Sequence, residues 1–138
     1  MARDIFHDVV KEALCAEGWL VTHDPLTLLS REEGDLQTDI GAERMITAEK
    51  GIEKIAVEVK SFTNPSIIHD FLLATGQYQG YFIVMKKKNI ERTLFLAMPY
   101  YIYERLNELQ FFKDIISELS IKLLLFNPLT KKIESWKK

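Results

Sequence analysis

Residues 55–61 read Ile55-Ala56-Val57-Glu58-Val59-Lys60-Ser61, and this run decides the fold of the chain. Side chains alternate between the two faces of a strand, so the isoleucine and the two valines project to one face while Glu58 and Lys60 project to the other. We therefore predict a strand over residues 54–62 with one apolar face and one face that carries a carboxylate beside an ammonium. Asp39, on an earlier predicted strand, could bring a second carboxylate to the same place.

The rest of the sequence predicts helices and further strands around this central strand. Apolar residues at helical spacing indicate helices, and short apolar or alternating runs between turn residues indicate strands. Helices are predicted over residues 4–17, 67–85, 100–109 and 111–119. Strands are predicted over residues 19–22, 36–46, 54–62, 93–98, 121–126 and 132–136, with a loop over 26–35 and a turn over 47–53. This order indicates one α/β domain, residues 1–138, with a mixed sheet flanked by helices.

Connection lengths predict how the strands pair. The first three strands are joined by short connections, which favours antiparallel pairing, whereas the helix over residues 67–85 makes a crossover and favours a parallel pair with the strand at 93–98. Gly76 and Gly80 lie four residues apart inside that helix, and we expect them to pack closely against another element. Gly41 could mark a β-bulge.

Composition excludes several classes of protein. The chain has 138 residues with 47% hydrophobic and 28% charged residues, so we expect an ordered globular domain rather than disorder. A single cysteine, Cys15, excludes an internal disulfide and a cysteine-based zinc site, and it is expected to be buried. The net charge of −2 argues against tight autonomous DNA binding. With no secretory signal and no membrane-spanning apolar run, the cytoplasm is the expected location.

Several short motifs carry a resemblance to known families. Asp39 followed by Glu58-x-Lys60 is similar to the core motif of the PD-(D/E)XK nuclease superfamily, which implies a restriction-endonuclease-like fold. The opening Ala2-Arg3-Asp4, Thr38-Asp39-Ile40-Gly41, the run from Val57 to Phe62, and Gly76-Gln77-Tyr78 give the whole chain a resemblance to the XisH family. These are the fdxN element excision controlling factors, found mainly in cyanobacteria.

The resemblance implies a metal-dependent site for phosphodiester cleavage. Asp39 and Glu58 would supply carboxylate oxygens to Mg²⁺ or Mn²⁺, and Val59 would supply its backbone carbonyl. The cation would polarise the scissile phosphate and acidify a bound water. Lys60 would stabilise charge on the phosphate or orient the attacking water.

Two further residues are candidates by position. Glu12 lies on the first predicted helix, where related nucleases often place a glutamate at the metal. Gln77 matches a helix glutamine that some superfamily members use near the site. The alternative for Glu12 is a solvent-exposed position beside the apolar face of the helix, and the alternative for Gln77 is an ordinary surface position.

Two functions stay open at this point. Judged from spacing alone, Glu58 and Lys60 favour an ordinary surface ion pair, worth under about 1 kcal/mol. The family resemblance favours instead an XisH-like factor that controls excision of a DNA element, with a metal-dependent endonuclease-type site. The alternative is a non-catalytic regulatory or protein-interaction module that retains the nuclease fold.

The resemblance also implies partners. DNA is one, bound weakly by this chain alone, and an XisI-like small partner protein and a site-specific recombinase are the others. A homodimer is considered because the two aromatic-rich helices, over residues 100–109 and 111–119, are very apolar for a solvent-exposed surface. No membrane partner is expected.

Overall fold

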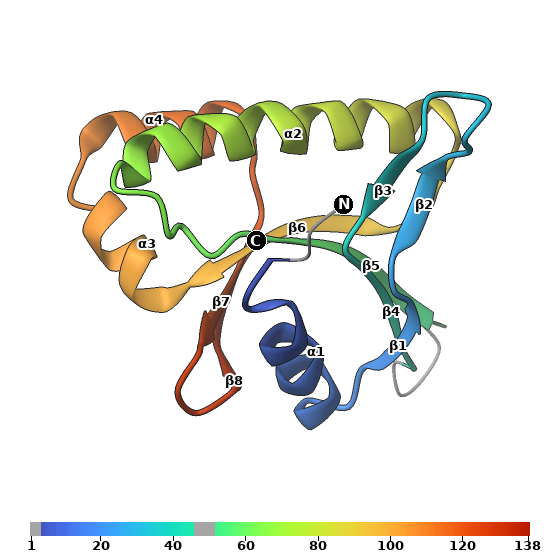
Figure 1. Cartoon of the computed structure of the whole chain (residues 1–138), viewed down its shortest axis with the longest axis horizontal. Coiled ribbons are helices and arrows are strands. Elements are labelled where there is room, and N and C mark those ends of the chain that lie inside the picture. The colour runs from blue at the N-terminus through green and yellow to red at the C-terminus, as the bar shows by residue number, and fades with distance from the viewer. Residues whose placement is uncertain (1–3, 46–51) are drawn as a thin grey trace.

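The computed structural model describes residues 4–45 and 52–138, and these residues form a mixed sheet with helices on both faces (Figure 1). The helices are α1 (His7–Ala16), α2 (Ile67–Lys87), α3 (Tyr100–Leu106) and α4 (Gln110–Glu118). The strands are β1 (Leu20–His23), β2 (Leu26–Leu29), β3 (Leu36–Thr38), β4 (Ile40–Met45), β5 (Ile52–Val59), β6 (Thr93–Pro99), β7 (Leu123–Asn127) and β8 (Lys132–Lys137). In the described residues, no helix combines the length and the apolar character needed to cross a membrane.

The main sheet has six strands in the order β1-β4-β5-β6-β7-β8. Pairing is antiparallel from β1 to β5, parallel through β5, β6 and β7, and antiparallel again between β7 and β8. This confirms the predicted antiparallel start, because β1, β4 and β5 are the three early strands. It also confirms the crossover of α2 into a parallel β5–β6 pair, and with it the α/β fold class.

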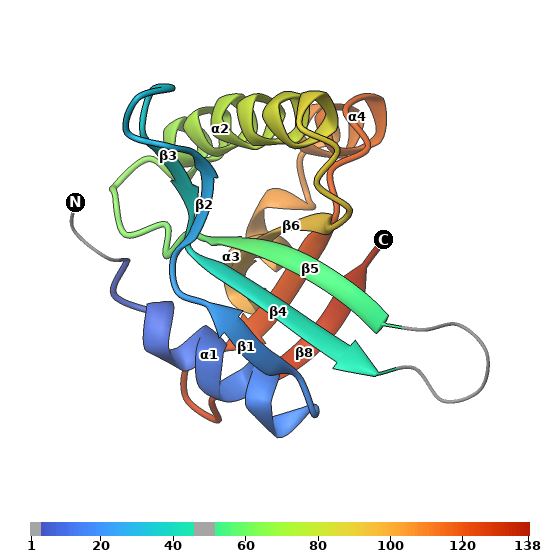
Figure 2. The same ribbon diagram turned by 90° about the vertical axis from the view of Figure 1, so that its right-hand side faces the viewer.

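The alternation of the central strand β5 separates two apolar cores, one on each face of the sheet. Ile55 and Val57 face the first core, where α1 contributes Val10 and Leu14. Ala56 faces the second core, beneath α2, α3 and α4. Figure 2 shows α1 on one side of the sheet and α2 with α4 on the other. Glu58 lies two residues after Ala56 and therefore shares the α2 side.

The segment before β5 differs from the sequence-based prediction. Residues 26–35 were expected to form a loop, but β2 pairs with β3 in a separate two-stranded sheet. Leu26 and Leu28 of β2 are buried while Thr27 between them is exposed, so a short period-2 pattern was overlooked. The single strand expected over 36–46 is in fact β3 and β4, separated at Asp39. Residues 47–51 of the predicted turn lie outside the described residues.

The expected β-bulge lies on the neighbouring strand rather than at Gly41 itself. The register of the β1–β4 pair shifts between Val21 and His23, and His23 pairs with Gly41. A Cβ atom added at Gly41 would come within 3.2 Å of His23 Cβ. Glycine at this position therefore lets the bulged strand approach closely.

Two other expectations about side-chain packing are not met among the described residues. Cys15 is exposed, because the sheet-facing stripe of α1 is formed by Val10, Ala13 and Leu14. Gly76 and Gly80 contact no other element, since a Cβ added at either one would meet nothing within 4 Å.

The aromatic helices α3 and α4 turn most of their rings inward. Phe112 is buried, and its ring centroid lies 4.7 Å from that of Phe71 and 5.9 Å from that of Tyr103. Their apolar character is therefore largely explained by the core of this chain.

Candidate active site

A cleft of about 360 Å³ lies where the break between β3 and β4 meets the end of β5 and the inner side of α2. Five of the six site residues predicted from the sequence line this cleft. They are Asp39, Glu58, Val59, Lys60 and Gln77. Residues separated by 38 positions in the sequence are thus brought to one place by the sheet and the crossover helix.

Asp39 occupies the point at which the chain leaves the small sheet for the main one. Its Oδ2 atom accepts a 2.8 Å hydrogen bond from the backbone N–H of Val59. Burial raises the pKa of Asp39, and the negative charge of Asp4 adds to this effect, although the Val59 hydrogen bond and the charges of His7 and Lys60 oppose it. The geometry thus holds this carboxyl in the cleft with one oxygen bonded to β5.

Glu58 is the most perturbed carboxyl in the cleft. Burial, followed by the negative charge of Asp39, raises the pKa of Glu58 from 4.5 to about 8, although Lys60 acts in the opposite direction. Lys60 Nζ lies 3.6 Å from Glu58 Oε2. The Asp39 and Glu58 carboxyls are therefore close enough to repel each other, and one lysine does not fully compensate them.

Helix α2 lines the cleft with Gln77 and Tyr81, which lie one turn apart. Burial and the charges of Glu58 and Asp39 raise the pKa of Tyr81, whose hydroxyl hydrogen-bonds Glu58. Tyr81 therefore stays a neutral phenol that can donate a hydrogen bond to a carboxylate.

Glu12, the sixth predicted residue, is not brought to the cleft. Its carboxylate lies 3.6 Å from Lys131 Nζ, and the two side chains are 61% and 56% exposed. Since Val10, Ala13 and Leu14 face the sheet, Glu12 points away from it.

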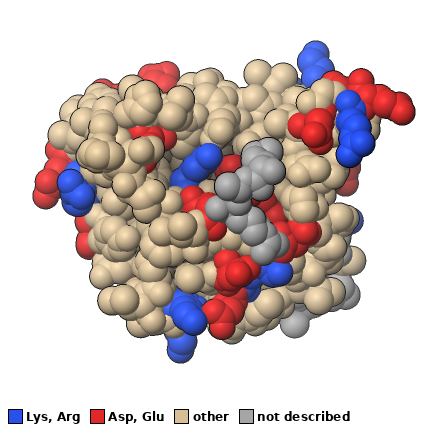
Figure 3. All heavy atoms as spheres, in the orientation of Figure 1, with Lys and Arg blue, Asp and Glu red and all other residues tan. Residues whose placement is uncertain are grey.

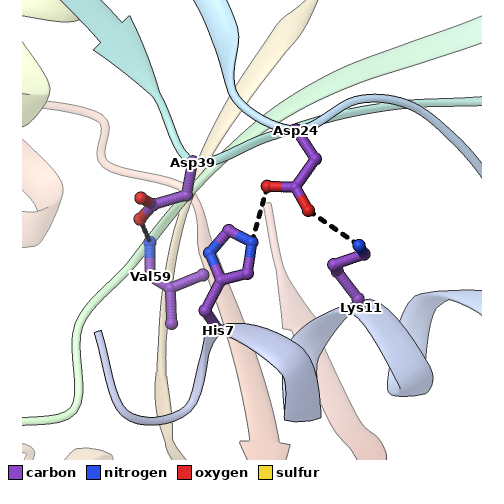
Figure 4. Close-up of polar contacts among 5 residues, drawn as sticks. All are labelled: His7, Lys11, Asp24, Asp39 and Val59. Carbon is purple, nitrogen blue, oxygen red and sulfur yellow. Dashed lines mark hydrogen bonds and ion pairs between the residues drawn. The ribbon is translucent and has the colours of Figure 1, made fainter. Parts of the chain in front are cut away.

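The residue that α1 does contribute to the cleft is His7, which the sequence analysis did not select. Figure 4 shows its ring between Asp24 and the Asp39–Val59 pair. His7 Nε2 lies 2.7 Å from Asp24 Oδ1, and Lys11 Nζ donates a 2.7 Å hydrogen bond to Asp24 Oδ2. A signal was present, because His7 precedes Val10 and Leu14 at helical spacing on the buried stripe.

Asp24 fixes the orientation of this histidine. Burial acts to raise the pKa of Asp24, but the hydrogen bonds and charges of Lys11 and His7 outweigh it and lower the pKa. An ionised Asp24 accepts the Nε2–H of His7, which leaves Nδ1 as the ring nitrogen that faces the cleft. In Figure 4 that nitrogen is on the side of Asp39 and Val59.

The donor set of the cleft fits a hard divalent cation that keeps several waters. Two buried polar atoms that line it, His7 Nδ1 and Thr38 Oγ1, have no hydrogen-bond partner among the described residues. Two crowded carboxyls and unsatisfied polar atoms suit Mg²⁺ or Mn²⁺, which need only one or two carboxylates. They do not suit a closed zinc cage, since the described residues hold no group of three His, Cys, Asp or Glu side chains arranged around one ion.

Comparison with known proteins gives one family and two solved structures. The family model described as XisH protein matches residues 1–134. An XisH family protein from Nostoc punctiforme is 39% identical, with a TM-score of 0.84, over 98% of this chain and 100% of that one. A fdxN element excision controlling factor protein from Anabaena variabilis is 38% identical, with a TM-score of 0.82, over 99% of this chain and 100% of that one. None of the curated proteins compared with the chain matches it.

Proposed function

The chain belongs to the XisH family, and from this premise we propose that it controls the excision of a DNA element through a metal-dependent endonuclease-type site. The solved relative from Anabaena variabilis is described as a fdxN element excision controlling factor, and the likeness to it runs through 99% of this chain. This full-length likeness supports the role in excision. The chemistry of the cleft supports the nuclease-type site.

The observation that carries the nuclease-type site is the convergence of Asp39, Glu58 and Lys60. Asp39 raises the pKa of Glu58 through its charge, and Lys60 lies 3.6 Å from Glu58, so the three groups share one small volume. This is the constellation of the PD-(D/E)XK superfamily, to which we assign the chain. A cation bound here would remove the repulsion between the two carboxylates, which the lysine alone does not remove.

Each residue then has a defined task. Asp39 and Glu58 hold the cation, together with the backbone carbonyl of Val59. The cation supplies Lewis acidity toward a phosphate and a bound water. Lys60 binds a non-bridging phosphate oxygen and stabilises the negative charge that develops there.

The flanking residues orient the reactants. Gln77, on the exposed rim of the cleft, offers an amide to the phosphate or to the water. His7 turns Nδ1 toward the cleft, with its ring held by Asp24. Glu12 has no part in this site, because it lies outside the cleft.

The protein partners follow from the family resemblance. We propose that DNA is the substrate and that an XisI-like small protein and a site-specific recombinase act together with this chain. The net charge of −2 supports this division of labour, because a chain without a basic surplus holds DNA weakly on its own. Figure 3 shows acidic and basic side chains interspersed on one face rather than a continuous basic stripe.

The test is cleavage of supercoiled plasmid by purified protein with Mg²⁺ or Mn²⁺. Wild type is compared with Glu58→Gln, Lys60→Ala and the matched control Glu12→Gln, which changes the same chemical group outside the cleft. We expect nicking by wild type and by Glu12→Gln, and a loss of at least 100-fold, roughly the effect of removing one charge-stabilising group, in the other two. Equal nicking by all four proteins would identify a contaminant.

The second candidate function is a non-catalytic regulatory module that keeps this fold. It is favoured by the lack, among the described residues, of a ready-made group of three metal ligands. Calorimetric titration with Mn²⁺ separates the two candidates without an activity assay. Saturable binding that is lost in Glu58→Gln supports the nuclease-type site, whereas no binding and no nicking support the regulatory module.

A further inference from the structure

Helix α2 carries large apolar side chains on its outer as well as its inner side, although it lies at the surface of the chain. Its residues 71–85 include no Asp, Glu, Lys or Arg. The inner side carries buried residues such as Phe71 and Met85. The outer side exposes five large apolar side chains: Ile68 (41%), Leu72 (48%), Leu73 (56%), Phe82 (54%) and Ile83 (57%). A helix with large apolar side chains on two sides is normally covered on both, and the described residues cover only one.

The outer side has the spacing of a helix–helix packing seam. His69, Leu73, Gly76, Gly80, Ile83 and Lys87 follow one another at intervals of 4, 3, 4, 3 and 4 residues. That alternation keeps the six positions on one stripe of the helix, as in a coiled-coil seam. A Cβ added at Gly76 or Gly80 would meet nothing within 4 Å, so the stripe has a flat, open centre. Two glycines at this spacing allow another helix backbone to approach closely, and no element of the described chain does so.

The seam is symmetric about residue 78, and this symmetry indicates that a second copy of α2 packs against it. Gly76 and Gly80 are equally far from residue 78, and so are Leu73 and Ile83. When two copies of α2 pack antiparallel, Gly76 meets the partner's Gly80 and Leu73 meets the partner's Ile83. A two-fold axis thus places small residues against small ones and large apolar residues against large ones, which is the self-complementarity that an isologous dimer requires.

We propose that the chain forms a homodimer in which the outer faces of two α2 helices pack antiparallel across Gly76 and Gly80. The five exposed apolar side chains present on the order of 500 Å², near the upper end of the largest apolar patch of a typical monomer. An interface of standard size buries roughly 800 Å² on each partner, so these side chains would supply about half of that area.

The other apolar surface considered for a dimer is smaller. On α3 and α4, Tyr101 and Phe111 are only 41% and 37% exposed, and most of the neighbouring rings belong to the core. Figures 1 and 2 show α2 along the outer edge of the molecule, with α3 nearer the sheet. The dimer is therefore assigned to α2, and it does not depend on whether the cleft cuts DNA.

Glycine substitutions test the proposal because they should leave the monomer at least as stable while they weaken the dimer. Gly80→Leu adds a side chain into open space in the monomer, and it removes a residue that destabilises a helix interior. In the dimer the same side chain separates the two backbones. We expect Gly80→Leu to fold at least as stably as wild type and to raise the dimer dissociation constant by more than about tenfold, the effect of losing one interface hot spot.

Sedimentation equilibrium over a range of concentrations gives these constants. Leu73→Glu should dissociate the dimer in the same way, and Leu129→Glu is the matched control because Leu129 is a 92% exposed leucine in a turn far from α2. A monomeric wild type at every concentration overturns the proposal. So does a dimer that persists in both Gly80→Leu and Leu73→Glu, because its interface would then lie elsewhere.

Cysteine pairing tests the antiparallel register. In a Cys15→Ser background, which removes the one native cysteine, proteins carrying Gly76→Cys or Gly80→Cys are mixed under mild oxidation. The proposed register predicts that the mixed 76–80 disulfide forms faster than either self-pair. Faster self-pairing at both positions would indicate parallel helices and would overturn the antiparallel arrangement.

Discussion

Val59 donates its backbone N–H to Asp39 Oδ2 at 2.8 Å, and this bond connects the break between β3 and β4 to the end of β5. The next residue back on β5 is Glu58, so the bond also fixes the separation between the two carboxyls of the cleft. One electrostatic consequence is the pKa of Glu58, which is raised to about 8 by burial and then by Asp39.

Substitution of Asp39 by asparagine tests that coupling. An asparagine oxygen can still accept the Val59 hydrogen bond, so the geometry is kept while the charge is removed. We expect the pKa of Glu58 to fall from about 8 and to stay above 4.5, because burial, its largest cause, remains. Carbon-detected NMR titration of the Glu58 carboxyl measures it. Glu12→Gln should leave this pKa unchanged, and an unchanged value in Asp39→Asn would contradict the coupling.

The raised pKa of Glu58 also predicts how stability depends on pH. The unfolded chain releases this proton near pH 4.5 and the folded chain near pH 8. Below pH 4.5 the Glu58 carboxyl is protonated in both the folded and the unfolded chain. Between pH 4.5 and pH 8 the chain must take up a proton at Glu58 when it folds, so the free energy of unfolding falls as the pH rises. Above about pH 8 it levels off.

Each unit of pKa difference corresponds to about 1.4 kcal/mol, so the loss across this window amounts to a few kcal/mol at most. Glu58→Gln has no such proton, and its free energy of unfolding should lack this slope. Urea unfolding of wild type and Glu58→Gln across the window gives the comparison. Parallel curves would show that the pKa of Glu58 is not raised in the folded chain.

Divalent cations should reverse the destabilisation at alkaline pH. A ligand that binds only the folded state stabilises it by about 2.7 kcal/mol at a concentration 100-fold above its dissociation constant. We expect Mn²⁺ to raise the melting temperature of wild type more above pH 8, where Glu58 is ionised, than near pH 5. Glu58→Gln should lose most of this shift and Glu12→Gln none of it. An equal shift in all three proteins would indicate binding outside the cleft.

Much of the fold could be predicted from the sequence because the clearest patterns lie within single strands and helices. The alternation of β5 around Glu58 assigned its two faces correctly, and the length of α2 indicated the parallel crossover. Features that depend on contacts between distant segments were harder to predict. Asp39 interrupts what reads as one strand, since the partner of β3 is β2 and not β5, and no local pattern reveals which strand a short segment will join.

The candidate site was predicted on the central strand and on α2, which supplies Gln77, and it was missed on α1. Strand alternation placed Glu58 and Lys60 on one face, and the family resemblance, not their spacing, assigned them with Asp39 to a metal site. On α1 successive residues are rotated by about 100°, so the five residues from His7 to Glu12 turn the buried histidine and the exposed glutamate about 140° apart. The glycines of α2 were expected to pack closely, but a Cβ added at Gly76 or Gly80 would meet nothing within 4 Å among the described residues.

His7 and Asp24 should be energetically coupled. Asp24 is part-buried and accepts hydrogen bonds of 2.7 Å from Lys11 and His7 Nε2, so removal of the histidine takes one of these two hydrogen bonds from its carboxylate. A hydrogen bond to a charged group contributes about 1.5–3 kcal/mol, and we expect a coupling of that order. A double-mutant cycle of His7→Ala and Asp24→Ala, followed by urea unfolding, measures it. Additive losses would mean that the pair is not coupled in solution.

Tyr78 gives a prediction about the fold that is independent of the site. Its hydroxyl donates a 2.9 Å hydrogen bond to the Leu94 carbonyl and accepts one of 3.2 Å from the Lys122 backbone N–H, so it ties α2 to β6 and to the start of β7. Tyr78→Phe keeps the ring and leaves both backbone groups without that partner. Because an unsatisfied buried polar group costs about 1–3 kcal/mol, we expect a loss of that size.

Tyr81→Phe is the contrasting variant for this prediction. Tyr81 lies on the same helix, and its hydroxyl bonds Glu58 rather than the backbone. It should therefore change the pKa of Glu58 more than it changes the free energy of unfolding. Chemical denaturation together with the carboxyl titration distinguishes the two effects. If Tyr78→Phe unfolds at the same denaturant concentration as wild type, the hydroxyl bridge contributes nothing to holding α2 on the sheet.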